Sequence, residues 1–277
     1  MANNRKNKFG SFSGVFTPSI LTILGVIMYM RLGWITANSG LVITIVIILV
    51  AHIISVTTGL SISSIATDKK IKTGGIYYIL SRSLGLPIGG AIGLTMFIGT
   101  ALSISLYLIG FAENFLGIGF IRELTGLGET VNDYRIVGTV TVVILFFIAF
   151  IGTSVAIKTQ FFIMAAIALS LLSVVAGFFF QESVPESPSI WPATDSLPFE
   201  VVFAIFFPAV TGFTAGVAMS GDLKDPRKNI PFGTLSAIVV GLIVYVSLSV
   251  GLAYFVDRDL MLADNNFLMK IAWFGPL

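Results

Sequence analysis

Residues 206–222, Phe206-Phe-Pro-Ala-Val-Thr-Gly-Phe-Thr-Ala-Gly-Val-Ala-Met-Ser-Gly-Asp222, lie in an apolar run long enough to cross a bilayer. The middle of this run carries Pro208, Gly212 and Gly216, and proline and glycine both disfavour a continuous helix. An interrupted membrane helix frees backbone N–H and C=O groups, which are tolerated only beside a cavity or a bound species. The pattern predicts either such an interruption or a kinked helix whose small residues allow close packing.

The composition is that of a membrane protein. The 277 residues are 56% hydrophobic and 11% charged, with a mean hydropathy of +0.97. A soluble domain of this length needs more charge on its surface, so we expect an integral membrane protein in contact with the lipid bilayer. The chain has no cysteine and one histidine, His52, which we interpret as a packed, hydrogen-bonded helix residue rather than a ligand or proton relay. Without an acid–base or nucleophile cluster, the sequence predicts neither an enzyme nor a cofactor, a metal site or a nucleic-acid partner.

Seven hydrophobic runs of roughly 20 residues or more predict seven transmembrane helices in an all-α, polytopic fold. The runs lie near residues 14–36, 41–66, 87–116, 137–156, 159–181, 199–221 and 232–256.

Basic and acidic residues alternate between the loops that connect these runs. Lysine and arginine gather before the first run and after the second, fourth and sixth: Arg5, Lys6, Lys8, Lys69, Lys70, Lys72, Arg82, Lys158, Lys224, Arg227 and Lys228. Acidic residues gather in the other loops: Glu123, Glu129, Asp133, Glu182, Glu186, Asp195, Asp257, Asp259 and Asp264. Because positively charged loops stay in the cytoplasm, we expect a plasma-membrane protein with a cytoplasmic N-terminal tail over residues 1–13. Lys72–Tyr78 fits a cytoplasmic re-entrant or interfacial segment, and Ser187–Pro192 fits an extracellular turn with an interfacial aromatic anchor. For both we prefer the interpretation as an ordinary loop.

The first hydrophobic run is also interrupted, by Pro18 near its cytoplasmic end and by Gly25 in mid-membrane. Interruptions in helices one and six are what an inverted repeat of five helices produces. We therefore expect one transporter domain over residues 14–277, with a first repeat over 14–181 and the start of a second over 199–277. A complete repeat needs ten helices, so either the second repeat is incomplete or the repeat interpretation is wrong.

The two interruptions offer two kinds of ligand. Free carbonyls can coordinate a cation, and the candidates are Leu21, Thr22, Ile23, Leu24, Pro208 and Thr211. Helix N-termini present N–H groups that suit an anion, at Gly25-Val-Ile27 and at Gly212-Phe-Thr214. Since no carboxylate lies beside either interruption, these groups suit a cation and an anion bound together.

Two ionisable residues lie within the predicted helices. Arg31 is nine residues after Thr22 and Glu113 is six residues after Tyr107. These separations place the charges about 13 Å and about 9 Å further along their helices. If Tyr107 is level with the first interruption, the two charges reach a similar depth and can pair as an extracellular gate, because unpaired charges inside a membrane are costly. The alternatives are that both charges extend to the interface and that Tyr107 is a packing residue.

Several motifs resemble those of the cation–chloride cotransporters, which have a leucine-transporter-like fold within the amino acid–polyamine–organocation superfamily. The resemblance runs from about residue 13 to the C-terminus. The motifs are Gly14-Val-Phe, Leu24-Gly-Val-Ile-Met-Tyr-Met-Arg-Leu-Gly-Trp-Ile35, Ser63-Ser-Ile-Ala-Thr67, Gly74-Gly-Ile-Tyr-Tyr-Ile-Leu-Ser-Arg-Ser-Leu-Gly85, Tyr107-Leu-Ile-Gly-Phe-Ala-Glu113, Phe207-Pro-Ala-Val-Thr-Gly-Phe-Thr-Ala-Gly216 and Ser220-Gly-Asp-Leu-Lys-Asp-Pro226. The resemblance implies a secondary active symporter that moves potassium and chloride, with sodium in some members, by alternating access.

The resemblance also implies a role for individual residues. The potassium site of the family falls on Thr22, Ile23, Tyr107, Pro208 and Thr211. Two chloride sites fall on Gly25, Val26 and Ile27 and on Gly212, Phe213 and Thr214. Part of a sodium site, which also needs hydroxyls from helix eight, falls on Leu21 and Leu24, and the family's outer charge pair falls on Arg31 and Glu113.

The sequence departs from the family at three places. Thr22 stands where the family usually has asparagine, and Ser13 stands where relatives often have a basic residue. The chain ends at Phe274-Gly-Pro-Leu277, where relatives enter helix eight, so we expect a fragment of a protein whose full-length form is a homodimer.

Two other functions stay open. One is an amino-acid permease of the same superfamily, although Leu24-Gly-Val-Ile27 lacks the usual Gly-x-Gly interruption. The other is a non-transporting or decayed membrane paralogue.

Overall fold

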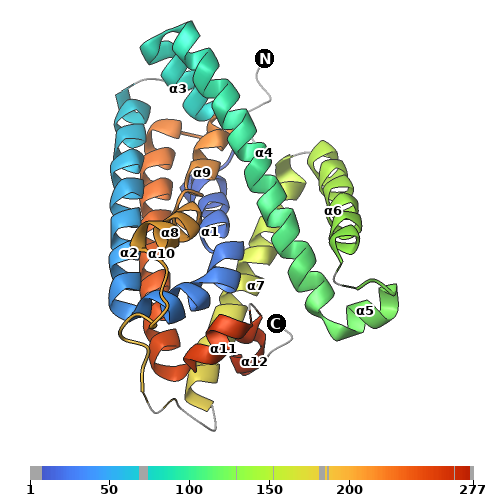
Figure 1. Cartoon of the computed structure of the whole chain (residues 1–277). Helices are drawn as coiled ribbons and strands as arrows, with labels where there is room; N and C mark the ends of the chain where they lie inside the picture. Colours follow the sequence, from blue (N-terminus) through green and yellow to red (C-terminus); the bar gives the residue numbers. More distant parts are fainter. Residues whose placement is uncertain are drawn as a thin grey trace. The chain divides into compact units, whose positions relative to one another are not determined.

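The chain folds into helices, as the hydropathy pattern predicts (Figure 1). The computed structural model describes residues 8–68, 74–128, 130–151, 153–180, 185, 187–264 and 266–274. Within these ranges the one extended pairing is an isolated bridge between Phe9 and Leu223. The elements are η1 (Phe12–Phe16), α1 (Thr17–Ile23), α2 (Val26–Asp68), α3 (Gly75–Leu84), α4 (Leu86–Gly117), α5 (Gly119–Thr125), α6 (Val131–Ile151), α7 (Thr153–Phe180), α8 (Phe199–Phe206), η2 (Phe207–Val210), α9 (Thr214–Ala218), η3 (Met219–Asp222), α10 (Pro226–Phe255), α11 (Arg258–Ala263) and α12 (Phe267–Ile271).

Six helical stretches among the described residues are long and apolar enough to cross a membrane. They are Phe12–Asp68, Leu86–Gly117, Val131–Phe150, Ile157–Phe180, Phe199–Asp222 and Pro226–Phe255. The first has 57 residues, which is more than twice the length that one crossing needs, and it contains the first two predicted runs. The seven predicted runs therefore correspond to helices, apart from the interruptions described below, and the chain is an integral membrane protein. The prediction of the fourth run over 137–156 is corrected, because α6 ends at Ile151 and Lys158, predicted to separate two runs, lies inside α7.

Gly40 separates the first two predicted helices within α2. Its backbone has φ 70° and ψ 162°, which an L-residue with a side chain hardly adopts, and the chain turns sharply there (Figure 1). Leu41 N–H donates to the Ser189 carbonyl at 2.9 Å, and Val42 N–H donates to the Ile190 carbonyl at 3.3 Å. The loop around Ser189 therefore supplies acceptors that the helix after Gly40 cannot supply itself.

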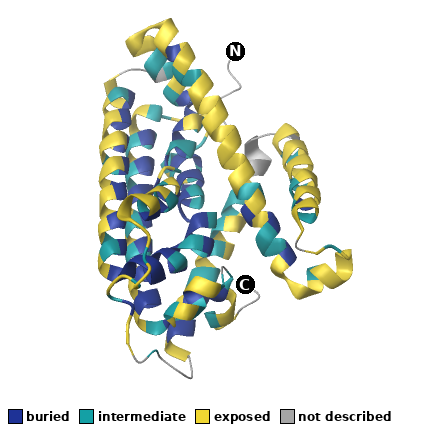
Figure 2. Ribbon diagram, viewed as in Figure 1, coloured by how far each residue is buried: buried dark blue, intermediate teal, exposed yellow. Residues whose placement is uncertain are grey.

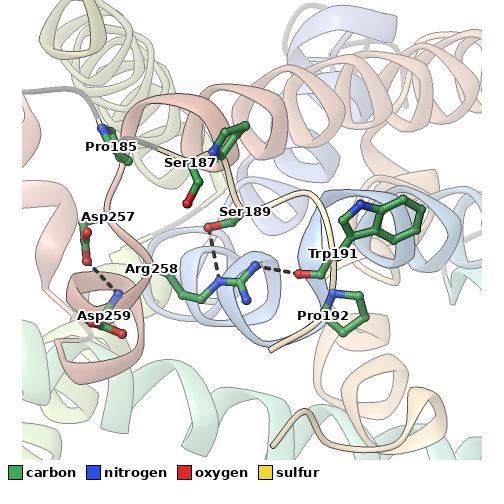
Figure 3. A pocket seen from close by; sticks show the side chains of 9 residues that line it. Pro185, Ser187, Ser189, Trp191, Pro192, Asp257, Arg258 and Asp259 are labelled. Carbon is green, nitrogen blue, oxygen red and sulfur yellow. Dashed lines mark hydrogen bonds between the residues drawn. The ribbon is translucent and has the colours of Figure 1, made fainter. Parts of the chain in front are cut away.

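The segment Ser187–Pro192 is a loop, as predicted, and it is also tied to α11. The Arg258 guanidinium donates from Nε to Ser189 Oγ at 3.3 Å and from Nη2 to the Trp191 carbonyl at 2.6 Å (Figure 3). A hollow of about 540 Å³ lies between this loop and the start of α11. Its lining is polar, and Asp257 and Asp259 belong to it.

The chain divides into two compact units, residues 1–79 with 160–277 and residues 80–159. In the first unit, α10 packs along α2, α8 packs against α2, and α1 packs against α10. Buried residues concentrate on the faces where α1, α2 and α10 meet, and exposed residues cover their outer faces (Figure 2). The buried side chains include Met28, Ile47, Phe206, Ile230 and Tyr245.

The second unit has a small core in which Ala112 and Leu116 of α4 pack near Val137 of α6. The other faces of these two helices carry large exposed apolar side chains, such as Phe97 and Phe150. Such faces suit a helix that contacts lipid, because lipid tails leave apolar side chains without a penalty.

Four short helices correct the sequence prediction. Part of Lys72–Tyr78, interpreted as a loop, begins the helix α3, whose first amide, Gly75 N–H, donates to Ser220 Oγ at 3.2 Å. The helices α5, α11 and α12 were not predicted, because each has seven residues or fewer and carries no periodic signal. α11 depends on a local cap in which the Asp257 side chain accepts from Asp259 N and Leu260 N.

Between α11 and α12, Lys270 Nζ lies 2.8 Å from Asp264 Oδ2. The hydrogen bond from Lys270 holds the pKa of the Asp264 carboxyl below its usual value. Several charged residues of the predicted topology lie outside the described residues: Arg5, Lys6, Lys69, Lys70, Lys72, Glu129, Glu182 and Glu186.

Candidate ion-binding site

The first interruption lies where it was predicted. α1 ends at Ile23, Leu24 leaves the helical region with φ −87° and ψ 42°, and α2 begins at Val26. Because α1 ends there, the carbonyl of Ile23 falls in a last helical turn, where carbonyls lack a partner within the helix.

The second interruption is also present, so the alternative of a continuous kinked helix is wrong. α8 ends at Phe206, and a 3₁₀ turn over Phe207–Val210 contains Pro208. Thr211, Gly212 and Phe213 are not helical, and α9 begins at Thr214. Thr211 Oγ1 donates to the Pro208 carbonyl at 2.8 Å within this segment.

The two interruptions contact each other directly. Thr22 Oγ1 lies 2.7 Å from the Gly212 carbonyl, and Ser19 Oγ donates to the Phe213 carbonyl at 2.9 Å. A Cβ atom at Gly212 would lie 2.5 Å from Thr22 Oγ1 and 2.6 Å from Thr22 Cβ. Only glycine therefore lets the two backbones approach this closely.

Two further side chains reach the interruptions from neighbouring helices. Ser55 of α2 donates to the Val210 carbonyl at 2.9 Å. Tyr245 of α10 donates from its hydroxyl to the Ile23 carbonyl at 2.7 Å. Ser19, Ser55 and Tyr245 were not predicted from the sequence as part of the site. A partial signal was available for Ser55, which lies three residues after His52 and shares its helix face.

His52 is a packed, hydrogen-bonded residue, as predicted. It is 3% exposed, and its Nδ1 lies 2.8 Å from the Ile48 carbonyl. Because a carbonyl only accepts, Nδ1 carries the proton in this arrangement. Its Nε2 is buried without a hydrogen-bond partner in the described part of the chain.

The predicted potassium ligands divide between the two units. Thr22 and Ile23 end α1, and Pro208 and Thr211 lie on and beside η2, which packs against α1. Tyr107 lies on α4 in the second unit, so the geometry of the first unit does not include it. Four of the five predicted ligands are thus brought to one region.

The predicted chloride ligands lie where two helices begin. Gly25 precedes α2, and Val26 and Ile27 are its first residues, where the N–H groups have no partner within the helix. Gly212, Phe213 and Thr214 lead into α9, which has five residues. Arg31 lies on α2, and its predicted partner Glu113 lies on α4 in the second unit.

The predicted sodium ligands border an apolar cavity. The side chains of Leu21 and Leu24 line a cavity of about 180 Å³ together with residues of α7 and Val240 of α10. The cavity has almost no polar lining, so only backbone carbonyls of this region could serve a cation. No group of three acidic, histidine or cysteine side chains that could hold a metal ion occurs within the described ranges.

Removing the Thr22 hydroxyl should destabilise the contact between the interruptions. Thr22→Val keeps the shape of the side chain and removes the hydroxyl, which lies 2.7 Å from the Gly212 carbonyl and also 2.8 Å and 3.0 Å from the Ser19 and Pro18 carbonyls of its own helix. We expect the free energy of unfolding to fall by about 1–2 kcal/mol, measured by thermal unfolding in detergent. The matched control is Thr57→Val, an exposed position whose hydroxyl bonds only within its own helix. Equal effects of the two variants would contradict the prediction.

The chain has two interrupted helices that hydrogen-bond to each other at their interruptions, and they lie among helices able to span a bilayer. This arrangement is that of a membrane transporter. The chain belongs to the amino acid permease family, whose sequence profile matches residues 14–270. Members of this family are transporters rather than enzymes, and the leucine-transporter-like fold expected from the motifs is consistent with this membership.

The resemblance to the cation–chloride cotransporters is confirmed by individual relatives. Solute carrier family 12 member 2 of Mus musculus is 38% identical over 265 residues, which cover 91% of this chain and 22% of the relative. Member 3 of Mus musculus is also 38% identical, with 91% and 26% covered. Member 1 of Mus musculus is 36% identical, with 95% and 25% covered. The chain thus corresponds to the N-terminal membrane portion of this family and spans about a quarter of these relatives' length.

Proposed function

We propose that this chain carries the ion-binding half of a secondary active symporter that couples potassium and chloride movement by alternating access. The supporting observation is the pair of hydrogen bonds between the interruptions, from Thr22 to Gly212 and from Ser19 to Phe213. These bonds hold the ends of the two interrupted helices at one place, and the residues next to the interruptions in the sequence include no carboxylate.

Carbonyl oxygens at the two interruptions coordinate the cation. The Ile23 carbonyl accepts from the Tyr245 hydroxyl and keeps a second lone pair for the cation. The Pro208 carbonyl accepts from both the hydroxyl and the N–H of Thr211, so a cation there replaces at least one of these donors. Thr22 and Thr211 add oxygen ligands. Oxygen ligands without a fixed negative charge favour potassium when an anion binds nearby. The amides at the start of α2 and before α9 serve chloride, and Tyr107 completes the potassium site. Leu21 and Leu24 contribute carbonyls to a sodium site in the full-length form.

The loop charges and one backbone pairing support the proposed orientation. Phe9 N–H donates to the Asp222 carbonyl and Lys224 N–H donates to the Phe9 carbonyl, both at 2.9 Å. The N-terminal segment and the loop after the sixth hydrophobic run therefore lie on the same side. Both carry lysine, which supports a cytoplasmic N-terminus in the plasma membrane. The full-length form is proposed to be a homodimer.

The test is chloride-dependent rubidium uptake into proteoliposomes. It uses the 277-residue chain and the product extended through its natural downstream reading frame. Saturable uptake that requires chloride and that amino acids do not inhibit supports the symporter. Uptake of amino acids without chloride-dependent rubidium uptake supports the permease, which is the second candidate because the matching family profile is that of the amino acid permeases. No uptake of either substrate by either form supports a non-transporting paralogue.

The proposed outer gate predicts a rescue by charge exchange. Glu113→Gln removes one charge of the proposed pair with Arg31, and we expect rubidium uptake to fall about tenfold because the proposed gate then loses its ionic attraction. The double variant Arg31→Glu with Glu113→Arg should recover part of the uptake. Normal membrane expression of all variants is the control. Rubidium uptake by the double variant that does not exceed that of Glu113→Gln would contradict the pairing.

A further inference from the structure

The hydroxyl of Tyr245 contacts the first interruption. The residue is fully buried on α10, and its hydroxyl lies 2.7 Å from the carbonyl of Ile23. That carbonyl belongs to the last residue of α1, so the hydroxyl takes the place of the amide that a continuous helix would supply. A hydroxyl on a separate helix thus sets the direction of this carbonyl.

The ring of Tyr245 is held from two sides. It makes an edge contact with the ring of Phe206, with centroids 5.2 Å apart and planes at 82°. It makes a second edge contact with His52, with centroids 6.1 Å apart and planes at 63°. Phe206 ends α8 two residues before Pro208. The Tyr245 side chain therefore contacts residues next to both interruptions, Ile23 and Phe206. Such a ring has little freedom to let its hydroxyl move.

Ile23 is also pressed against α10 one turn before Tyr245. A Cβ atom at Gly241 would lie 2.7 Å from Ile23 Cγ2, so the glycine is needed for α10 to approach the end of α1. The close approach brings Ile23 into reach of the Tyr245 hydroxyl. Gly241 therefore leaves room for the Ile23 side chain, and Tyr245 donates a hydrogen bond to the Ile23 carbonyl.

We infer that Tyr245 is a positioning residue for the transported cation, an inference that rests on the proposed function. A carbonyl oxygen has two lone pairs, and Tyr245 occupies one of them. The other lone pair then points in a fixed direction and is available to the cation. The hydroxyl prevents the Ile23 carbonyl from turning away when the site is empty, and this preorganisation raises the affinity for the cation and not for chloride.

The variant Tyr245→Phe tests this inference, because it removes only the hydroxyl. In rubidium uptake by the natural product that contains this chain, we expect the KM for rubidium to rise about five- to tenfold. The KM for chloride should stay within about twofold, and so should the yield of folded protein. The matched control is Tyr254→Phe on the same helix, where the side chain is 44% exposed, and it should leave both constants unchanged.

The outcomes separate this inference from the proposed function. No chloride-dependent rubidium uptake by the unmodified protein would overturn the proposed function and this inference with it. Normal uptake by the unmodified protein, with equal changes in the two KM values or with no change in Tyr245→Phe, would overturn the inference alone. If Tyr245→Phe gives no folded protein, Gly241→Ala takes its place, because it displaces Ile23 without touching the hydroxyl. That variant should also raise the KM for rubidium and spare the KM for chloride.

Discussion

Gly212→Ala should reduce rubidium uptake about tenfold or more, because the new methyl group separates the two interrupted helices. Its Cβ would lie 2.5 Å from Thr22 Oγ1 and 2.9 Å from the Thr22 backbone carbon. A neighbour that is backbone cannot rotate away, so the two segments must move apart and the Thr22 hydrogen bond to Gly212 is lost. Overpacking of this kind costs about 1–3 kcal/mol, and about 1.4 kcal/mol corresponds to a factor of ten in binding.

The measurement is uptake per folded molecule, with the folded fraction taken from gel filtration in detergent. Gly10→Ala is the matched control, since nothing lies within 4 Å of a Cβ atom at that position. It should transport normally. Full activity of Gly212→Ala would mean that the close approach of the two segments is not needed for transport.

The largest loss of stability is expected from Gly40→Ala. Gly40 has φ 70° and ψ 162°, a region of backbone conformation that is essentially restricted to glycine, and a Cβ atom there would lie 2.6 Å from the carbonyl oxygen of Ile190. Both the strain and the clash act on the turn between the first two helices. We expect the free energy of unfolding to fall by about 3 kcal/mol or more, with little folded protein recovered.

Gly126→Ala provides the comparison for Gly40→Ala. Gly126 also has a positive φ, of 68°, but it lies in the left-handed helical region and nothing lies within 4 Å of its Cβ position. Its replacement should cost only about 1–2 kcal/mol. Similar thermal unfolding of the two variants would show that the contact with the Ile190 loop adds nothing to the strain.

Hydropathy was sufficient to predict the long helices, because membrane helices need continuous apolar runs and nothing else in the chain provides them. It could not reveal α5, α11 and α12, which have seven residues or fewer and are too short for a periodic signal. α10 begins at Pro226 rather than near residue 232, because Pro226 is favourable in the first turn of a helix and the charged residues that follow it hide the helix from a hydropathy scan. The repeat boundaries at 14–181 and 199–277 stay predictions.

The breaks in the helices were predictable from Pro18, Gly25, Pro208 and Gly212, since these residue types act locally. Their partners were not predictable, because Ser19 and Phe213 are 194 residues apart and Tyr245 and Ile23 are 222 apart. Contacts over such separations depend on how the helices pack, which a single sequence does not encode locally. The ion assigned to each ligand set stays a prediction.

Asn38 connects the second half of the first interrupted helix to the segment that leads into α8. It lies in the half of the first helix beyond the break, where its carbonyl accepts from Ala193 N–H at 2.9 Å and its Oδ1 accepts from Leu197 N–H at 3.0 Å, just before α8. The opposite halves, α1 and α9, are tied through Ser19 and by the close approach of Gly216 to Val15. The four half-helices therefore form two pairs, and the interruptions at Leu24–Gly25 and Thr211–Phe213 connect one pair to the other. In the symporter that we propose, a movement of one pair of half-helices relative to the other would open the proposed ion site to one side of the membrane and close it to the other.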